Sequence, residues 1–405
     1  MLVSDDTANA CPQDTLYSQL REEWIINMIV VGAGLTGCVT ARCIAESGYK
    51  VDLFEKKDHI GGAIYDYTDA HGVMIQKYGP HIFHTNLDRV YAFIHRFSEW
   101  EAFEHRVLCD IDGVLCPLPF NLSSLDKCFS AAQAEVFRQK LIEKIGEGNT
   151  VSIGELSRSD DNDLKELASF VYENVFLHYT IKQWGMSPEE LGGDVLSRVP
   201  VRVSYDDRYF ADTYQCMPKN GYTAFLEEML RHKNIEVHMG CDPDERIAVR
   251  DGEVLMDGQT YPDPVVHTGS LDKLLHYRWG ELPYRTLEFV MKSAEWKFQP
   301  VAVVNYPKAP DFTRITEFGH FYPDRPYRAS TLLYEYPMAY RPESGCEPYY
   351  PIPTAKCGEL YDAYIRETGR CGNFYSAGRL GSYKYMNMDI AISEGLTLAE
   401  KIVKT

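Results

Sequence analysis

A buried strand that runs into a glycine-rich turn constrains this chain more than any other feature. Residues 29–37 read Ile-Val-Val-Gly-Ala-Gly-Leu-Thr-Gly, and an acid, Glu55, closes the next strand. In a βαβ unit of this kind, Gly32 permits the tight turn, Gly34 lets a pyrophosphate approach the backbone, and Gly37 lets the helix pack on the strand. The helix amino terminus then offers unpaired N–H groups and a positive dipole end to phosphates. With Glu55 placed to accept hydrogen bonds from a ribose, the pattern predicts a dinucleotide site.

Two further segments favour FAD over a nicotinamide cofactor. A second glycine pair, Gly61-Gly62, follows the ribose-binding acid, as in many flavoproteins. Near the end of the chain, a predicted strand ends in Gly378-Arg379, where the arginine would meet the pyrophosphate. A helix then opens at Met388-Asp389 and would point its amino terminus at the flavin ring. A plain turn and an ordinary docking helix are the alternatives for each segment alone, but together with the first motif they predict FAD.

Composition limits the class of protein. The 405 residues exceed a comfortable single core, so we expect two or three domains. A net charge of −18 is a poor match for nucleic acid or an anionic membrane. The eleven cysteines form no Cys-x-x-Cys pair and no zinc pattern, residues 1–23 do not resemble a secretory signal, and no apolar run is long enough to span a bilayer. The chain therefore reads as a reduced cytoplasmic protein without a metal site, and residues 1–27 as a variable extension.

The spacing of apolar residues along the chain changes twice after the βαβ unit. From Leu87 to about Gln183, apolar residues recur at helical spacing, as at Ala134, Phe137 and Leu141. Beyond this stretch, short alternating runs separated by turn residues predict an antiparallel sheet. The last forty residues return to strand, turn and helix. We therefore predict an α/β protein with inserted helices and a second sheet.

Five widely separated motifs then occur along the chain. They read Tyr-Gly-Pro-His-Ile-Phe-His-Thr at 78–85, Tyr-Thr-Ile-Lys-Gln-Trp-Gly at 179–185, Arg-Val-Pro-Val-Arg at 198–202, Met-Pro-Lys-Asn-Gly-Tyr-Thr at 217–223 and Gly-Arg-Leu-Gly-Ser-Tyr at 378–383. In sequence and in order they resemble the UDP-galactopyranose mutase family, and the resemblance covers essentially everything from Met28 to the end. It implies a discontinuous Rossmann-like FAD-binding domain (28–86, 215–269 and 366–405), an inserted helical domain (87–196) and an antiparallel β-sheet domain (197–214 and 270–365).

The resemblance implies an isomerisation with no net redox change. In the family, a nucleotide-linked sugar passes between its six- and five-membered ring forms, and N5 of reduced FAD attacks the anomeric carbon and expels the nucleotide diphosphate. The implied partners are a nucleotide sugar, UDP-galactopyranose by default, and a flavin reductant, either NAD(P)H or a reductase. Neither nucleic acid nor a membrane span is implied, and family members commonly form homodimers.

The site residues implied by the resemblance fall into three groups. The catalytic set is His81, His84, Arg198 and Arg314. The arginines would clamp the diphosphate, since a guanidinium donates bidentate bonds to phosphate and never loses its charge, and the histidines would lie beside the flavin. The substrate is implied to contact Tyr179, Thr180, Trp184, Arg198, Tyr209, Arg285, Asn305, Arg314, Tyr349, Tyr385 and Asn387. The cofactor is implied to contact Gly32, Gly34, Leu35, Thr36, Gly37, Glu55, Lys56, Gly61, Gly62, His81, Ile82, Gly378, Arg379, Met388 and Asp389.

The chain departs from the family's pattern at several places. Asn387 stands where an aspartate is usual, so a negative charge is lost and an amide donor is gained. Val175 and Phe176 stand where paired aromatics near the uracil are frequent. Tyr334 replaces a common arginine, and Ala63 a common asparagine. These changes leave FAD and the ring isomerisation in place but open the question of the substrate.

Three alternatives follow. A mutase that acts on another nucleotide sugar is the first. A hydride-transferring flavoprotein of the amine-oxidase or desaturase kind is the second, although an apolar amine or polyene needs no pair of arginines for a diphosphate. A flavin- or nucleotide-binding protein without catalytic activity is the third.

Overall fold

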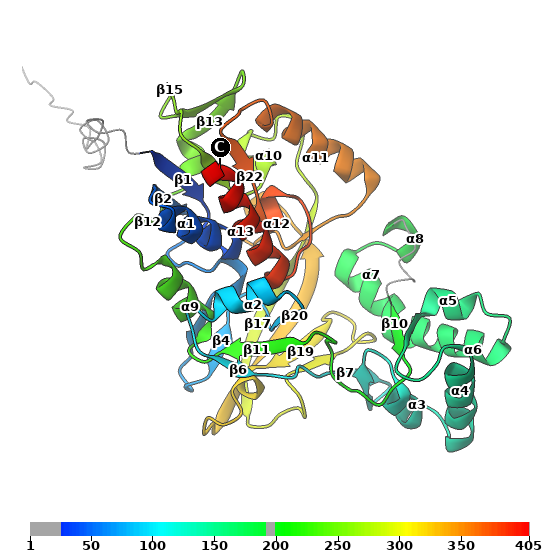
Figure 1. Cartoon of the computed structure of the whole chain (residues 1–405). Coiled ribbons are helices and arrows are strands. Elements are labelled where there is room, and N and C mark those ends of the chain that lie inside the picture. The colour runs from blue at the N-terminus through cyan, green and yellow to red at the C-terminus, as the bar shows by residue number, and fades with distance from the viewer. Residues whose placement is uncertain (1–25, 192–198, 405) are drawn as a thin grey trace, which may run out of the picture.

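The computed structural model describes residues 26–191 and 199–404, and it contains the predicted Rossmann-like unit (Figure 1). The core of this unit is a fully parallel sheet of five strands. In spatial order the strands are β12 (Ile235–Met239), β2 (Lys50–Glu55), β1 (Asn27–Val31), β16 (Val265–His267) and β22 (Phe374–Ser376). Three distant parts of the chain therefore contribute to one sheet.

Alternate side chains of this sheet face two different cores. On one face, α1 (Leu35–Glu46) and α13 (Met388–Lys404) pack against each other over Val30 and Leu53, which have no exposed surface (Figure 1). The other face, which carries Ile29 and Phe54, packs against elements of the second core. Those elements are β13 (Ile247–Arg250), β14 (Glu253–Met256), α10 (Leu271–Leu274) and α11 (Ala355–Thr368), with β15 (Gln259–Thr260) pairing on β14. Coverage on both faces explains why the central strand β1 is apolar and buried from Met28 to Val31.

A second sheet of seven strands runs between the first domain and a group of helices (Figure 1). In spatial order its strands are β21 (Tyr350–Pro351), β17 (Tyr284–Glu295), β20 (Ala329–Ala339), β19 (Arg314–Glu317), β18 (Val303–Asn305), β7 (Val107–Ile111) and β8 (Val114–Leu118). Neighbouring strands are antiparallel except β18 and β7, which are parallel. A smaller antiparallel sheet joins β5 (Phe83–Thr85), β11 (Tyr214–Pro218) and β6 (Trp100–Ala102).

Six helices form the helical insert, the name used below for α3 to α8. They are α3 (Leu122–Cys128), α4 (Ala131–Lys144), α5 (Ile153–Ser157), α6 (Asn162–Val171), α7 (His178–Trp184) and α8 (Pro188–Leu191). A π-helical segment, Tyr172–Leu177, joins α6 to α7, and β9 (Thr150–Ser152) pairs with β10 (Pro200–Arg202) beside them. The remaining elements include β3 (Asp66–Thr68), β4 (Met74–Gln76), α2 (Asp88–Ile94), α9 (Gly221–Leu230) and α12 (Gly378–Gly381). Among the described residues, no helix combines the length and the apolar character that a membrane crossing needs.

The prediction that residues 87–196 are helical is wrong for part of that range. Residues 107–118 form a hairpin that extends the seven-stranded sheet. Its turn is Asp112-Gly113, and both residues have positive φ, 52° and 88°, as a tight two-residue hairpin turn requires. Burial alternates along β7 with the period of a strand. The turn signal was present in the sequence, but the surrounding helical periodicity concealed it.

Candidate functional site

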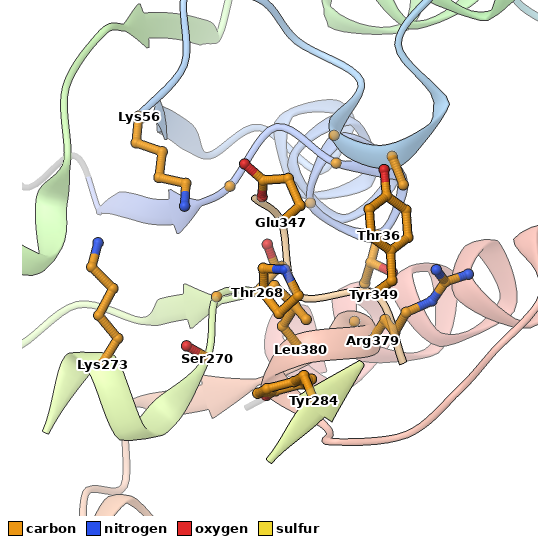
Figure 2. A pocket seen from close by; sticks show the side chains of 18 of the residues that line it. Thr36, Lys56, Thr268, Ser270, Lys273, Tyr284, Glu347, Tyr349, Arg379 and Leu380 are labelled. Atoms are coloured by element: carbon orange, nitrogen blue, oxygen red, sulfur yellow. The ribbon is translucent and has the colours of Figure 1, made fainter. Parts of the chain in front are cut away.

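The carboxyl ends of the parallel strands open onto a cavity of about 500 Å³ (Figure 2). This is the edge at which doubly wound sheets bind ligands. The predicted cofactor residues in its wall are Gly32, Gly34, Leu35, Thr36, Gly37, Glu55, Lys56, Gly61, Gly62, His81, Gly378, Arg379 and Met388. Figure 2 shows Arg379 and Tyr349 toward one end of the cavity and Lys56 and Lys273 toward the other.

The glycine turn leaves room where a phosphate would lie. A methyl group added at Gly34 would have no atom of the described chain within 4 Å, whereas one at Gly37 would overlap the carbonyl oxygen of Gly32. A methyl group at Gly62 would come within 3.2 Å of the Gly34 Cα. Gly34 is also the N-cap of α1, so the unpaired N–H groups of that helix face the cavity. The turn therefore fits the pyrophosphate of a dinucleotide.

Glu55, in the wall of this cavity, retains acceptor capacity. It is 6% exposed, and its carboxylate accepts the N–H of Ala33 at 2.8 Å and that of Lys57 at 3.0 Å. A carboxylate has about four acceptor positions, so roughly two remain for ribose hydroxyls. Lys57 Nζ also pairs with Glu347 Oε1 at 3.1 Å, and this pair links the end of β2 to a loop on the opposite wall.

In the carboxy-terminal segment, the predicted cofactor residue Arg379 lines the larger cavity and Asp389 does not. Arg379 lies in the cavity wall, donates to the Met386 carbonyl at 3.0 Å and stacks its guanidinium over the Tyr385 ring. The Asp389 carboxylate turns away from the cavity and accepts a hydrogen bond from Thr85 Oγ1 at 3.1 Å. It therefore fixes the start of α13 to β5, and Met388 is the residue of this pair that lines the cavity.

A smaller cavity of about 200 Å³ adjoins the first. Six residues line both cavities, namely Tyr78, His81, Tyr349, Arg379, Asn387 and Met388. The predicted catalytic and substrate residues in the wall of the smaller cavity are His81, His84, Tyr179, Tyr209, Asn305, Arg314, Tyr349, Tyr385 and Asn387. Ile82, predicted to contact the cofactor, lines this cavity and not the larger one. The tertiary structure thus brings the helical insert, the second sheet and the end of the chain to one place.

Three side chains form a row across neighbouring strands of the smaller cavity. Asn305 on β18 pairs with Arg314 on β19, and Arg314 pairs with Glu335 on β20. Arg314 Nε lies 2.6 Å from Glu335 Oε1, and Glu335 is 1% exposed. Burial raises the pKa of Glu335, and Arg314 opposes that rise. Asn305 Oδ1 is buried without a hydrogen-bond partner in the described chain. The row therefore offers the Arg314 guanidinium as a fixed cation and Asn305 Oδ1 as an unpaired acceptor. This combination suits a ligand that is an anion and also carries hydroxyl groups.

Tyrosine hydroxyls surround this row. Tyr349 donates to the Tyr78 carbonyl at 3.2 Å, and the rings of Tyr350 and Tyr385 stack at 5.9 Å. Burial raises the pKa of Tyr179 and raises that of Tyr350 to about 12. These phenols therefore stay protonated and can donate to phosphate oxygens. Tyr350 was not predicted, although it follows Tyr349 directly.

His81 lies where the two cavities meet. Its Nδ1 is 2.9 Å from the Gly79 carbonyl oxygen. A carbonyl only accepts, so Nδ1 carries the proton and Nε2 is left as an acceptor in the neutral ring. Burial and the nearby Arg379 and Arg314 lower the pKa of His81 to about 4. The ring is therefore uncharged at neutral pH.

Two further histidines line the smaller cavity. His84 pairs with Asp212 at 2.9 Å and stacks on Phe210 at 3.6 Å, so a carboxylate and a ring fix its orientation. His105 was not predicted, because it belongs to no motif. It is 3% exposed, and within residues 26–191 and 199–404 its buried Nδ1 has no hydrogen-bond partner. Burial lowers the pKa of His105 to about 3, so this ring is neutral as well.

Three further predicted substrate residues, Thr180, Trp184 and Arg285, lie outside both cavity walls. Arg285 is 9% exposed and donates to two carbonyls at the end of α7. Thr180 is buried on the same helix. The Trp184 ring lies 6.1 Å from that of Tyr350, which is in the wall. Arg198 falls outside the described residues, and its predicted role stays a prediction.

Comparison with known proteins identifies the family. The model of the family described as UDP-galactopyranose mutase matches residues 174–385, and a model described as NAD(P)-binding Rossmann-like domain matches residues 30–97. The chain is 36% identical to the "Probable UDP-galactopyranose mutase" of Klebsiella pneumoniae, over 94% of this chain and 95% of the relative. The chain belongs to the UDP-galactopyranose mutase family. It is therefore a mutase-type flavoenzyme, and its larger cavity fits the implied flavin.

Two other relatives of this mutase bear on substrate and fold. The dTDP-fucopyranose mutase of Escherichia coli is 31% identical over 93% of this chain and 98% of its own length. A crystal structure of reduced UDP-galactopyranose mutase superimposes with a TM-score of 0.69 at 17% identity, over 93% of this chain and 95% of that one. At this identity the superposition concerns the fold alone, and it confirms the predicted architecture.

Proposed function

We propose that this mutase interconverts the pyranose and furanose forms of a nucleotide diphosphosugar, UDP-galactopyranose first, with FAD in the larger cavity. The observation that supports this most is the shared wall at His81, Arg379 and Asn387. One cavity fits a dinucleotide, the other presents Arg314 for an anion, and the shared wall is where a flavin ring and a sugar would meet.

The residues of the smaller cavity suit a departing diphosphate. Reduced FAD, when bound, would supply the nucleophile for the anomeric carbon through its N5 atom. Arg314 would hold the diphosphate as negative charge develops, because its pair with Glu335 fixes the guanidinium beforehand. The protonated hydroxyls of Tyr179 and Tyr350 would donate to the same phosphates. Asn305 Oδ1 would accept a hydrogen bond from a sugar hydroxyl and so gain the partner it lacks.

His81 would orient a hydrogen-bond donor at the junction. Its free Nε2 accepts, and the low pKa keeps the ring neutral beside Arg379 and Arg314. A neutral acceptor at this point can hold a hydroxyl of the opened sugar without adding a third positive charge. Asn387 would add an uncharged amide on the same wall.

Turnover of UDP-galactofuranose tests the proposal directly. The purified protein is incubated with the furanose form with and without dithionite, and the sugar nucleotides are separated by chromatography. We expect conversion to the pyranose only when the flavin is reduced, with no stoichiometric use of reductant. Stoichiometric oxidation of a reductant would favour the hydride-transfer alternative. Binding of UDP without any conversion under dithionite would favour the non-catalytic one.

A dTDP-linked sugar is a second candidate substrate. The similarity to the dTDP-fucopyranose mutase of Escherichia coli is the observation in its favour, together with the uncharged Asn387. The same assay with the dTDP-linked furanose decides between the two, since the better substrate should have the higher kcat/KM. The use of NAD(P)H or a reductase and a homodimer are implied by the resemblance, and a cytoplasmic location was inferred from the composition. All of these stay predictions.

A further inference from the structure

Lys182, on α7, donates three hydrogen bonds from its ammonium group to the second sheet. Its Nζ donates to the carbonyl oxygens of Tyr306 at 2.8 Å, Ala309 at 2.7 Å and Phe312 at 2.7 Å. An ammonium has three N–H donors, so these three carbonyls satisfy it completely. All three carbonyls belong to the loop between β18 and β19. Burial lowers the pKa of Lys182 to about 8, as for a cation held away from bulk water.

Arg285 holds the carboxyl end of the same helix. From β17, its Nε donates to the Gln183 carbonyl at 2.9 Å and its Nη2 to the Lys182 carbonyl at 3.0 Å. The last carbonyls of a helix lack intrahelical partners and carry the negative end of its dipole, so a buried cation is favourable there. The Arg285 carbonyl also accepts the Tyr349 N–H at 3.0 Å. This one residue therefore touches both the helix and the wall of the smaller cavity.

Both contacts lead directly to the smaller cavity. The loop that Lys182 holds is flanked by Asn305 and Arg314, which lie in the cavity wall. On the helical side, α7 carries Tyr179, which also lies in that wall, and Trp184, whose ring is 6.1 Å from that of Tyr350. A displacement of α7 relative to the loop would thus change the distance between Tyr179 and Arg314.

We propose that Lys182 and Arg285 are positioning residues that dock the helical insert on the second sheet and set the width of the substrate cavity. The inference deepens the proposed function, on which it rests. It also gives Arg285 a role other than the phosphate contact predicted from the sequence, because its guanidinium is occupied by carbonyls of α7.

The test compares Lys182→Met with Lys182→Arg and with Lys165→Met, a matched control at an exposed position of α6 in the same insert. Affinity for UDP is measured by calorimetry on the oxidised protein, and amide hydrogen exchange is followed in residues 178–184. For Lys182→Met we expect a loss of UDP affinity on the order of tenfold and faster exchange in α7, since three charge-assisted hydrogen bonds are removed. The visible flavin spectrum should not change, and KM for the nucleotide sugar should rise more than kcat falls. Lys182→Arg should recover part of the affinity, and Lys165→Met should behave as wild type.

Unchanged UDP affinity and unchanged exchange in Lys182→Met would overturn the proposal. If Lys182→Met fails to fold, Arg285→Lys is tested in its place, because lysine keeps the positive charge but cannot make the two-nitrogen contact with α7. Normal UDP affinity and normal exchange in Arg285→Lys would also overturn the proposal. If the wild type neither binds nor converts UDP sugars, the proposed substrate fails, and the exchange of residues 178–184 still decides whether the two residues dock the insert.

Discussion

Replacing Gly34 by alanine should weaken cofactor binding and leave the fold intact. The new methyl group would have no atom of the described chain within 4 Å, and φ of −75° at Gly34 is accessible to alanine. The free energy of unfolding of the apoprotein should therefore stay the same or rise by up to about 1 kcal/mol, because alanine lowers the conformational entropy of the unfolded chain. The methyl group would stand where the backbone must approach a pyrophosphate. Loss of one charge-assisted hydrogen bond, about 1.5–3 kcal/mol, would weaken FAD binding roughly tenfold to 150-fold.

Gly37→Ala is the matched comparison. There the methyl group would overlap the Gly32 carbonyl oxygen, so the helix must move and the cost to folding should reach about 3 kcal/mol. The assay measures thermal unfolding of both apoproteins by circular dichroism and their titration with FAD by flavin fluorescence. The reasoning is refuted if Gly34→Ala binds FAD like the wild type, or if it unfolds as easily as Gly37→Ala.

Three further predictions concern pH, oxidation and charge. Burial and two arginines lower the pKa of His81 to about 4, so between about pH 6.5 and 4 the unfolded chain takes up a proton that the folded protein does not, and stability falls as the pH drops through this window. His81→Gln should therefore flatten the fall in Tm between pH 7 and 4. Equal slopes of Tm against pH in the variant and the wild type would contradict this. Cys116 Sγ and Cys128 Sγ lie 2.6 Å apart and twelve residues apart in sequence, so oxidation by diamide should form a disulfide that stabilises the fold by about 3 kcal/mol. Peptide mapping should find this bond, and the increase in Tm on oxidation should be absent in Cys116→Ser. A diamide-treated protein in which both thiols are still free would contradict the prediction. Asn387→Asp should weaken UDP binding roughly fivefold, because a carboxylate on the wall shared by the two cavities would repel the diphosphate by about 1 kcal/mol. Tighter UDP binding by calorimetry would contradict the placement of residue 387 beside the diphosphate.

The candidate site residues that the sequence could locate are those that belong to one short segment of the chain. The turn at Gly32 and Gly34 and the acid at Glu55 depend on spacing within one βαβ unit, and all three residues line the larger cavity. Glu335 and His105 could not be found in this way. Each owes its role to neighbours on other strands, Glu335 to Arg314 across β19 and β20, and His105 to the cavity wall it enters.

Arg285 shows why residue type alone is insufficient. A buried arginine in a phosphate-binding family suggests a phosphate contact, and the sequence offered nothing against it. The structure turns the guanidinium to the carbonyl groups of α7, which are more than 100 positions earlier in the chain. Asp389 is a similar case, because it was implied to contact the cofactor, whereas Thr85 on β5 donates a hydrogen bond to its carboxylate.

The sequence by itself indicated the family through its five motifs. It also determined the glycine turn and the two kinds of sheet, since these depend on local periodicity and on residues that are close along the chain. Only the tertiary structure decided which side chains line the smaller cavity. Strands β18, β19 and β20 align Asn305, Arg314 and Glu335 through cross-strand pairing. The docking of α7 then closes the cavity against that row. Such placement depends on burial and pairing between distant segments, which no local pattern encodes.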